Sequence, residues 1–214
     1  EIGDQVENPD AILVRSADLH KIPVNPELKA VARAGAGTNN VPVTELSKHG
    51  IVVFNAPGAN ANAVKELVLA GMLMAARNLP AALQFVAGLD ASDPNMDSRV
   101  EDGKKAFAGF ELTGHALGVI GLGRIGCLVA DAAIRLGMHV IGYDPDITVD
   151  AAWSLPAQVR KAHSVAELLK ASHFVSLHVP LVAATGVGGV EIDGILDGEA
   201  VGGAGAVVAG VGVA

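Results

Sequence analysis

One glycine pattern, Gly121-Leu122-Gly123-Arg124-Ile125-Gly126, constrains this chain of 214 residues more than any other feature. The apolar run Ala116 to Ile120 before it predicts a strand, and the stretch from about Arg124 to Leu136 predicts a helix. In that setting the first glycine allows a tight turn, the second lets the backbone approach a pyrophosphate, and the third lets helix and strand pack closely. Amide donors at the helix N-terminus then face the phosphates. The pattern therefore predicts a dinucleotide-binding fold.

An acidic residue completes the pattern. Asp144 directly follows the next apolar run, His139 to Tyr143, at roughly the 20-residue distance at which a carboxylate accepts hydrogen bonds from the adenosine ribose. A carboxylate there would repel a 2′-phosphate, so the expected cofactor is NAD and not NADP. Asp144 also begins the turn Asp144-Pro145-Asp146, and this structural role is compatible with the binding role.

The order of apolar runs predicts an α/β protein with two Rossmann-like lobes. Runs at Ala11–Val14, Ala30–Ala32 and Ile51–Phe54 have the β-α-β-α-β spacing of a parallel sheet covered on both faces. A helix at Val165–Lys170 and a strand at Phe174–Leu177 extend the alternation after the glycine pattern. We expect residues 1–55 to form a substrate-binding lobe, a truncated flavodoxin-like unit incomplete at its N-terminus. Residues 56–214 would form a doubly wound NAD-binding domain.

The end of this second domain is expected to be incomplete or poorly assigned. Every residue from Ala200 to Ala214 is Gly, Ala or Val. A core filled to native density needs larger side chains, and a flexible linker would usually contain Ser or charge.

A helix from Asn60 or Asn62 to about Asn78 is expected to begin the second lobe. Its apolar residues lie on all sides, so other protein should cover it, either the second lobe or another subunit. A homodimer or a higher homo-oligomer is the corresponding expectation, and an ordinary core helix is the alternative. The polar stretch from Gly88 to Gly109 indicates a surface excursion.

Composition excludes several classes of function. A net charge of −8 and a pI near 5.3 argue against a nucleic-acid partner, which requires a basic surface. The single cysteine, Cys127, allows no disulfide within the chain and fits a reducing compartment, so we expect the cytoplasm. The apolar run Leu67–Ala76 is shorter than the ~20 residues that span a bilayer, and no leader pattern opens the chain. No metal site is expected.

Three segments together carry a family resemblance: Leu117 to Gly126, Ile141 to Pro145, and His178-Val179-Pro180-Leu181. They closely resemble the D-2-hydroxyacid dehydrogenase family. Within it, three segments are similar to the phosphoglycerate dehydrogenase branch: Val14 to Ser16, Arg33 to Asn40, and Phe54 to Leu67. The resemblance covers about residues 8 to 185.

The resemblance implies oxidation of 3-phosphoglycerate at C2 with hydride transfer to NAD, the entry step of serine biosynthesis. The implied cofactor-binding residues are Gly121, Gly123, Arg124, Ile125, Gly126, Asp144, His178, Val179 and Pro180. The implied substrate-binding residues are Arg15, Ser16, Ala36, Gly37 and Asn60. Arginine suits this role because guanidinium binds carboxylate and phosphate through paired hydrogen bonds.

The catalytic residues of the family do not match this chain. The family uses an arginine, then a histidine base oriented by a glutamate; the arginine position falls at or beside Val208, and the other two fall beyond Ala214. The chain then represents part of a working dehydrogenase or a catalytically inactive, NAD-sensing relative similar to the corepressors of the family. A methyltransferase or flavoprotein with a similar glycine loop is disfavoured by Asp144 and by the first lobe.

Overall fold

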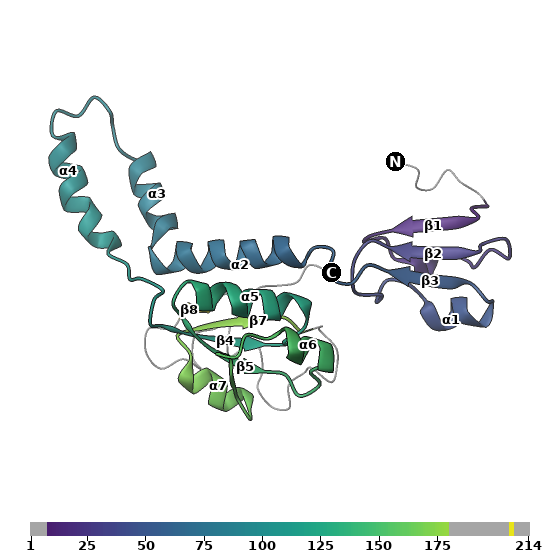
Figure 1. Ribbon diagram of the computed structural model, residues 1–214. Helices are drawn as coiled ribbons and strands as arrows, with labels where there is room; N and C mark the ends of the chain where they lie inside the picture. The colour runs from purple at the N-terminus through teal and green to yellow at the C-terminus, as the bar shows by residue number, and fades with distance from the viewer. Residues whose placement is uncertain (1–7, 180–205, 208–214) are drawn as a thin grey trace. The chain divides into compact units, whose positions relative to one another are not determined.

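The computed structural model describes residues 8–179 and 206–207. The chain forms two compact units, and the division falls between Asn62 and Ala63. The expected domain boundary, between residues 55 and 56, lies at the end of the last strand of the first unit. Figure 1 shows the elements of both units, which are described separately below.

The first unit is built on three parallel strands in the order β1-β2-β3. They are β1 (Ala11–Val14), β2 (Ala30–Arg33) and β3 (Val52–Asn55), within one residue of the strands that the apolar runs predict. The connections contain the short helices η2 (Leu19–Lys21) and α1 (Val43–Lys48). This confirms the parallel α/β character of the lobe.

The two faces of this small sheet differ. One face packs into an apolar core of Val14, Leu19, Leu28, Val31, Val41, Leu46 and Ile51. The opposite face carries Leu13, Val52 and Phe54, which are 81%, 51% and 58% exposed. The expectation that both faces are covered is therefore wrong for the described part of this unit, because its helices and connections supply a core on one side only.

The second unit is a five-stranded parallel sheet in the order β6-β5-β4-β7-β8. Its predicted strands are confirmed as β4 (Ala116–Ile120), β5 (His139–Tyr143) and β7 (Phe174–Leu177). The outer strands are β6 (Arg160–Lys161) and β8 (Ala206–Val207). The chain enters this sheet at the central strand β4, adds β5 and β6 on one side, and then adds β7 and β8 on the other. This is the doubly wound arrangement expected from the sequence.

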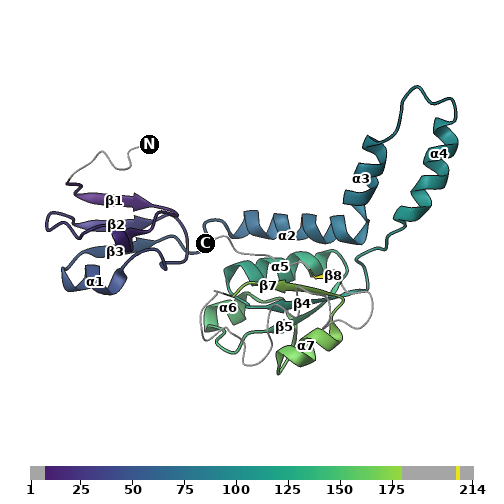
Figure 2. The same cartoon turned by 180° about the vertical axis from the view of Figure 1, so that it is seen from behind.

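Helices lie on both faces of the second sheet. α5 (Arg124–Arg135) and α2 (Ala61–Ala76) supply the core on one face, where Val129, Met72 and Phe174 are fully buried. α7 (Val165–Ala171) covers the other face with Val165 and Leu168. α6 (Val149–Ser154) packs beside α5. Figure 2 shows the sheet between these layers from behind.

The polar stretch from Gly88 to Gly109 lies on the surface, and it contains the helix α4 (Met96–Gly103) and the 3-10 helix η3 (Lys104–Phe107). The helix α3 (Leu79–Ala87) precedes this stretch, and none of the three contains a buried residue. The rings of Phe85 and Phe107 lie 5.3 Å apart between their centroids and join α3 to η3. The segment is thus a helical arm held by a small aromatic contact.

α2 is apolar on all sides but buried on one. Val68, Met72 and Ala76 are within the core, whereas Leu67, Leu73 and Met74 are 73%, 43% and 41% exposed. No single described helix is long and apolar enough to cross a bilayer; α2 and α3 meet that test only as a pair, across a 68° bend. The described residues therefore leave an apolar stripe of α2 uncovered.

Candidate cofactor and substrate sites

The glycine loop has the geometry that its sequence predicts. Gly121 adopts φ +89°, a left-handed conformation that favours glycine. A side chain at Gly126 would place its Cβ 2.0 Å from the Gly121 carbonyl oxygen, so helix and loop can approach only without one. Gly123 has no heavy atom within 4 Å of such a Cβ. The second glycine therefore leaves open space above the loop.

The loop lies where the order of strands reverses. It leaves β4, whose neighbours β5 and β7 lie on opposite sides, and it leads into the N-terminus of α5. Arg124 and Ile125 form the first turn of α5; Arg124 is exposed and Ile125 is half-buried. Ligands of open α/β sheets bind at the carboxyl ends of the strands at such a reversal. The helix N-terminus offers free amide donors there.

Asp144 is joined to the loop by a direct hydrogen bond. Its Oδ2 accepts from the Leu122 N–H at 2.8 Å, and its Oδ1 accepts from the Asp146 N–H at 3.0 Å. The carboxylate therefore both holds the loop and begins the turn after β5. Since a carboxylate offers about four acceptor sites, it retains acceptor capacity for ribose hydroxyls.

The thiol of Cys127 bonds to the carbonyl group of Leu122, the residue whose N–H bonds to Asp144. The Cys127 Sγ donates to the Leu122 carbonyl oxygen at 3.2 Å, and Cys127 is 8% exposed. Burial raises the pKa of the Cys127 thiol, and the nearby charge of Asp144 raises it further. Cys127 is thus a protonated packing residue beneath the loop.

His178 and Val179 lie against the first glycine of the loop. The His178 N–H donates to the Ile120 carbonyl at 2.8 Å. A Cβ built on Gly121 would lie 2.6 Å from the His178 carbonyl oxygen and 2.8 Å from Val179 Cγ1. Burial lowers the pKa of His178 to about 4, so its ring is neutral at neutral pH. Pro180, also expected at the cofactor, lies outside the described residues.

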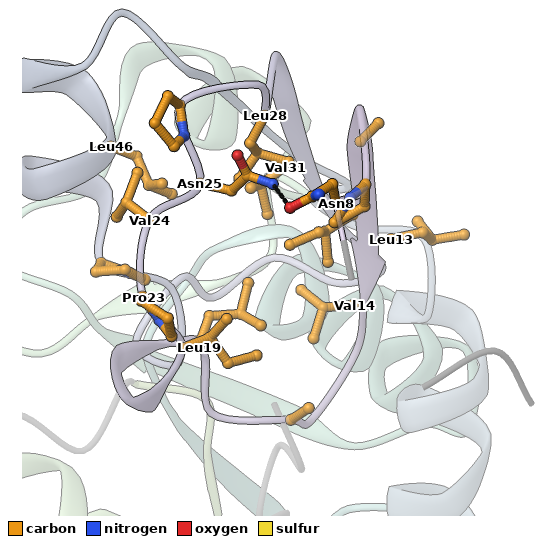
Figure 3. Close-up of a pocket in the computed structure, with 17 residues that line it drawn as sticks. Asn8, Leu13, Val14, Leu19, Pro23, Val24, Asn25, Leu28, Val31 and Leu46 are labelled. Carbon is orange, nitrogen blue, oxygen red and sulfur yellow. Dashed lines mark hydrogen bonds between the residues drawn. The ribbon is translucent and has the colours of Figure 1, made fainter. Parts of the chain in front are cut away.

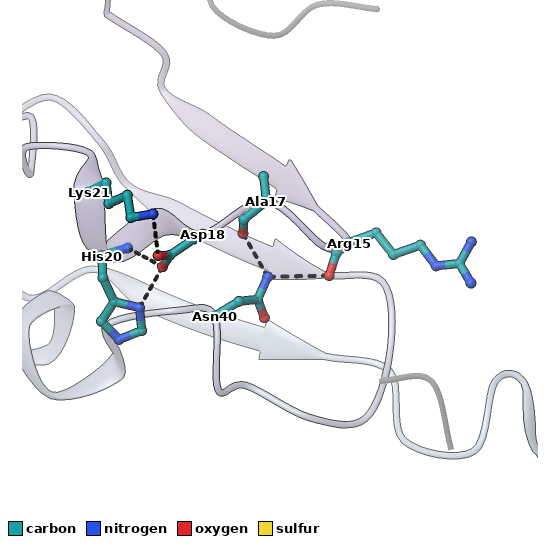
Figure 4. Close-up of polar contacts among 6 residues, drawn as sticks. All are labelled: Arg15, Ala17, Asp18, His20, Lys21 and Asn40. Atoms are coloured by element: carbon teal, nitrogen blue, oxygen red, sulfur yellow. Dashed lines mark hydrogen bonds and ion pairs between the residues drawn. The ribbon is translucent and has the colours of Figure 1, made fainter. Parts of the chain in front are cut away.

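The expected substrate-binding residues share one edge of the first sheet. Arg15 and Ser16 follow β1, Ala36 and Gly37 follow β2, and Asn60 follows β3. Parallel strands have their carboxyl ends at one edge, so these segments belong to the same side of the unit. Asn40 holds the first segment, because its Nδ2 donates to the carbonyls of Arg15 at 3.3 Å and Ala17 at 2.8 Å. In Figure 4 the Arg15 guanidinium points away from these contacts.

Arg33 lies at this same edge, and sequence reasoning missed it as a site residue. It is 4% exposed, and its Nε has no hydrogen-bond partner in the described structure. Its side chain lies against Gly35, where a Cβ would be 2.0 Å from Nη1. A charged residue that ends the apolar run Ala30 to Arg33, directly before a glycine turn, was the available signal.

One cavity of the first unit does not suit an anionic substrate. It has a volume of about 940 Å³ (Figure 3). Among the described residues that line it, only Asn8 and Asn25 have polar side chains, and these bond to each other at 2.9 Å. None of these described lining residues is charged. The cavity is therefore distinct from the edge of the sheet that carries Arg15 and Arg33.

No catalytic set can be placed in the described residues. Val208, where the family's arginine would fall, lies outside them. Within the described ranges, no group of three or more His, Cys, Asp or Glu could hold a metal ion.

Known proteins identify the family. Residues 69–187 match the family described as D-isomer specific 2-hydroxyacid dehydrogenase, NAD binding domain. The chain belongs to this family. It is 39% identical over 188 residues to a D-3-phosphoglycerate dehydrogenase of Methanocaldococcus jannaschii, covering 86% of this chain and 33% of that protein. It is 38% identical over 179 residues to a hydroxypyruvate reductase of Thermotoga maritima, covering 82% and 53%.

Solved structures agree with this assignment. A D-lactate dehydrogenase of Aquifex aeolicus, complexed with NAD and lactic acid, superimposes with a TM-score of 0.65 at 28% identity. The match covers 85% of this chain and 51% of that one. The cofactor of the family's domain is NAD, and the open loop at Gly123 and the carboxylate of Asp144 fit it. The chain spans about a third of the length of the D-3-phosphoglycerate dehydrogenases that it matches.

Proposed function

We propose that the intact protein is an NAD-dependent dehydrogenase that oxidises 3-phosphoglycerate at C2 to 3-phosphohydroxypyruvate, the entry step of serine biosynthesis. The observation that carries the proposal is the Asp144 carboxylate bonded to the glycine loop at the reversal of strand order. The names of the M. jannaschii and other bacterial and archaeal relatives support the choice of substrate. Residues 1–55 would bind the substrate and residues 56–214 the cofactor.

In this proposal the second unit holds the dinucleotide. Gly121, Gly123 and Gly126 shape the loop, and the α5 amides at Arg124 and Ile125 face the pyrophosphate. Asp144 would accept from the adenosine ribose, while His178 and Val179, which lie against Gly121, would contact the cofactor together with Pro180. When bound, NAD would accept the hydride that leaves C2.

The first unit would hold the two anionic groups of the substrate. Arg15 and Ser16 contact carboxylate or phosphate, the amides of Ala36 and Gly37 add donors, and Asn60 contributes its carboxamide. We add Arg33 to this set. A buried guanidinium with a free Nε is stabilised when an oxyanion completes its hydrogen bonds. A substrate with two anionic groups can use both arginines.

Another 2-hydroxy acid is the alternative substrate, and one relative favours it. The T. maritima protein is named a hydroxypyruvate reductase, and hydroxypyruvate carries no phosphate. Oxidation of 3-phosphoglycerate by the intact protein, followed through NADH absorbance, should exceed that of D-glycerate and D-lactate by at least tenfold in kcat/KM. Equal values for D-glycerate would leave the dehydrogenase assignment intact and remove the phosphate-binding role. NAD binding without turnover of any of the three would favour the NAD-sensing reading.

We also propose a homodimer. Leu67, Leu73 and Met74 of α2 and Leu79, Leu83 and Val86 of α3 form exposed apolar stripes. Apolar surface of this extent is typically covered by protein. Sedimentation of the intact protein at micromolar concentration should give a dimer, and replacing Leu67 and Leu83 by Gln should shift it toward monomer. An unmutated protein that sediments as a monomer would contradict the proposal.

A further inference from the structure

A buried serine and a histidine lie two residues apart on one face of β7 and its extension. Ser176 is fully buried, opposite Val119 in the sheet register. Its Oγ lies 2.8 Å from Nε2 of His178. Neither residue is adjacent in sequence to the glycine loop, yet the backbone of His178 lies directly against Gly121.

This contact determines which ring nitrogen of His178 carries the proton. Among the described residues, His178 Nε2 is the hydrogen-bond partner of the Ser176 hydroxyl. If Nε2 carried the proton, it would donate to Oγ and leave the buried O–H of Ser176 without an acceptor, which is costly. If Ser176 instead donates to Nε2, the hydroxyl is satisfied and the proton of the neutral ring lies on Nδ1. The neutral ring follows from burial, which lowers the pKa of His178 to about 4.

The second nitrogen is left without a partner. His178 Nδ1 is buried, and it has no hydrogen-bond partner in the described part of the chain. The main chain of His178 is fixed by its bond to Ile120 on β4. A buried N–H donor without an acceptor is costly. Because Nδ1 is closed to solvent in this structure, a ligand acceptor reaches it only when the groups that cover it shift on binding.

We propose that Ser176 is a positioning residue: it holds His178 in the Nδ1–H tautomer so that this N–H donates to an oxygen or nitrogen acceptor of the bound dinucleotide. The inference rests on the proposed NAD-binding function of this site. Ser176 acts only through His178 and does not itself touch the cofactor.

The tautomer can be measured directly in the intact protein labelled with ¹⁵N-histidine. Long-range ¹H–¹⁵N correlation at pH 7 should show the His178 ring, assigned through His178→Gln, protonated at Nδ1. Saturating NAD should shift the Nδ1 resonance. A ring protonated at Nε2 in the free protein, or an Nδ1 resonance unmoved by saturating NAD, would overturn the proposal.

Variants separate positioning from a general effect on folding. Ser176→Ala should give a mixture of tautomers and raise the Kd for NAD roughly 3–10-fold, the range expected for one lost hydrogen bond. Ser176→Thr, which keeps the hydroxyl, should restore both. The matched control is Ser172→Ala, which removes a serine hydroxyl bonded at 2.7 Å to the Leu168 carbonyl in the same unit. Ser172→Ala should change neither the tautomer of His178 nor the Kd for NAD. Unchanged NAD affinity and tautomer in Ser176→Ala would contradict the proposal.

Failure of this proposal can be distinguished from failure of the proposed function. If the unmutated protein binds no NAD, both the proposed function and the donor role of His178 are wrong. If it binds NAD with His178 protonated at Nε2, only the present inference is wrong.

Discussion

The two parallel sheets of this protein differ in how completely their faces are covered and in how completely the polar groups at their strand ends are hydrogen-bonded. In the second unit helices cover both faces, and the loop at the strand ends is held by Asp144 and Cys127. In the first unit one face exposes Leu13, Val52 and Phe54, and the strand ends carry Arg33, whose Nε bonds to no residue that the structure describes. The glycine loop is therefore preformed by contacts within its own unit. The candidate substrate edge instead carries a buried guanidinium that an anion could complete.

The largest effect should come from disturbing the preformed loop. Gly126→Ala forces a Cβ to within 2.0 Å of the Gly121 carbonyl oxygen, so loop and helix must separate. Displacement of about 1 Å in a preorganised site costs on the order of 100-fold, and the Kd for NAD should rise by at least that factor. Isothermal titration calorimetry measures this Kd. Gly88→Ala is the control, because a Cβ there has only ordinary contacts, at 3.5 Å or more. NAD affinity within twofold of normal in Gly126→Ala would refute the preformed-loop account.

Acid should distinguish the two units by stability. The pKa of His178 is lowered to about 4, so between about pH 6.5 and pH 4 the unfolded chain binds a proton that the folded one does not. The free energy of unfolding of the second unit should therefore fall as the pH drops through this window, by on the order of 3 kcal/mol. Urea unfolding at pH 7 and pH 4.5 measures the change.

The matched variant for this experiment is His178→Gln, which removes the titrating ring. It should lose most of the pH dependence between pH 7 and pH 4.5. In the first unit, His20 pairs with Asp18, and hydrogen bonding by His20 lowers the pKa of that exposed carboxyl. The Asp18 carboxylate is therefore protonated only below the usual pH range of aspartate, and it lies at the surface. An equal acid response with and without His178 would show that its burial is not the cause.

The arginines of the first unit should affect substrate binding and leave cofactor binding unchanged. A charge-assisted contact to an anion contributes about 2–3 kcal/mol, so Arg15→Ala should raise the KM for 3-phosphoglycerate by roughly 30–150-fold. The Kd for NAD should remain within twofold. An unchanged KM would remove Arg15 from the site.

Arg33 provides a sharper form of the same test. Arg33→Met keeps most of the side-chain volume and removes a buried charge that has no ion-pair partner in the described structure. Replacing a buried charge by an apolar group of similar size is often neutral or stabilising. We therefore expect a raised KM with unchanged or higher thermal stability. A large loss of stability would indicate that Arg33 is structural and does not bind substrate.

The difference between the units also explains what the sequence could predict. Strands β4 and β5 follow from apolar runs that lead into the glycine loop and into Asp144, because the local pattern and the ligand chemistry act on neighbouring residues. Strand β7 follows from its apolar run alone. β6 and α6 were not predicted: Arg160–Lys161 is too short and polar for a strand pattern, and α6 depends on a Thr148 cap and contacts with α5.

Burial was the property that local sequence predicted least well. The run Ile51 to Phe54 is apolar throughout, yet alternate residues point to a covered and an uncovered face. Arg33 is the opposite case, a charged residue that is buried. Ser176 has no motif that marks it, and only the distance to His178 Nε2 reveals a role. These properties depend on neighbours distant in sequence.

The smallest expected effect concerns cofactor choice, because two contributions of Asp144 oppose each other. Asp144→Asn removes the charge that repels a 2′-phosphate, which should help NADP. It also weakens the acceptor of the buried Leu122 N–H, which should harm both cofactors by about 1–2 kcal/mol. The Kd for NAD should therefore rise about tenfold while that for NADP changes little, so the preference narrows without reversing. Asp146→Asn is the matched control, since it removes a neighbouring exposed charge without touching the loop. Titration of both variants with NAD and NADP measures the ratio, and equal affinities for the two cofactors in the unmutated protein would remove Asp144 as the determinant.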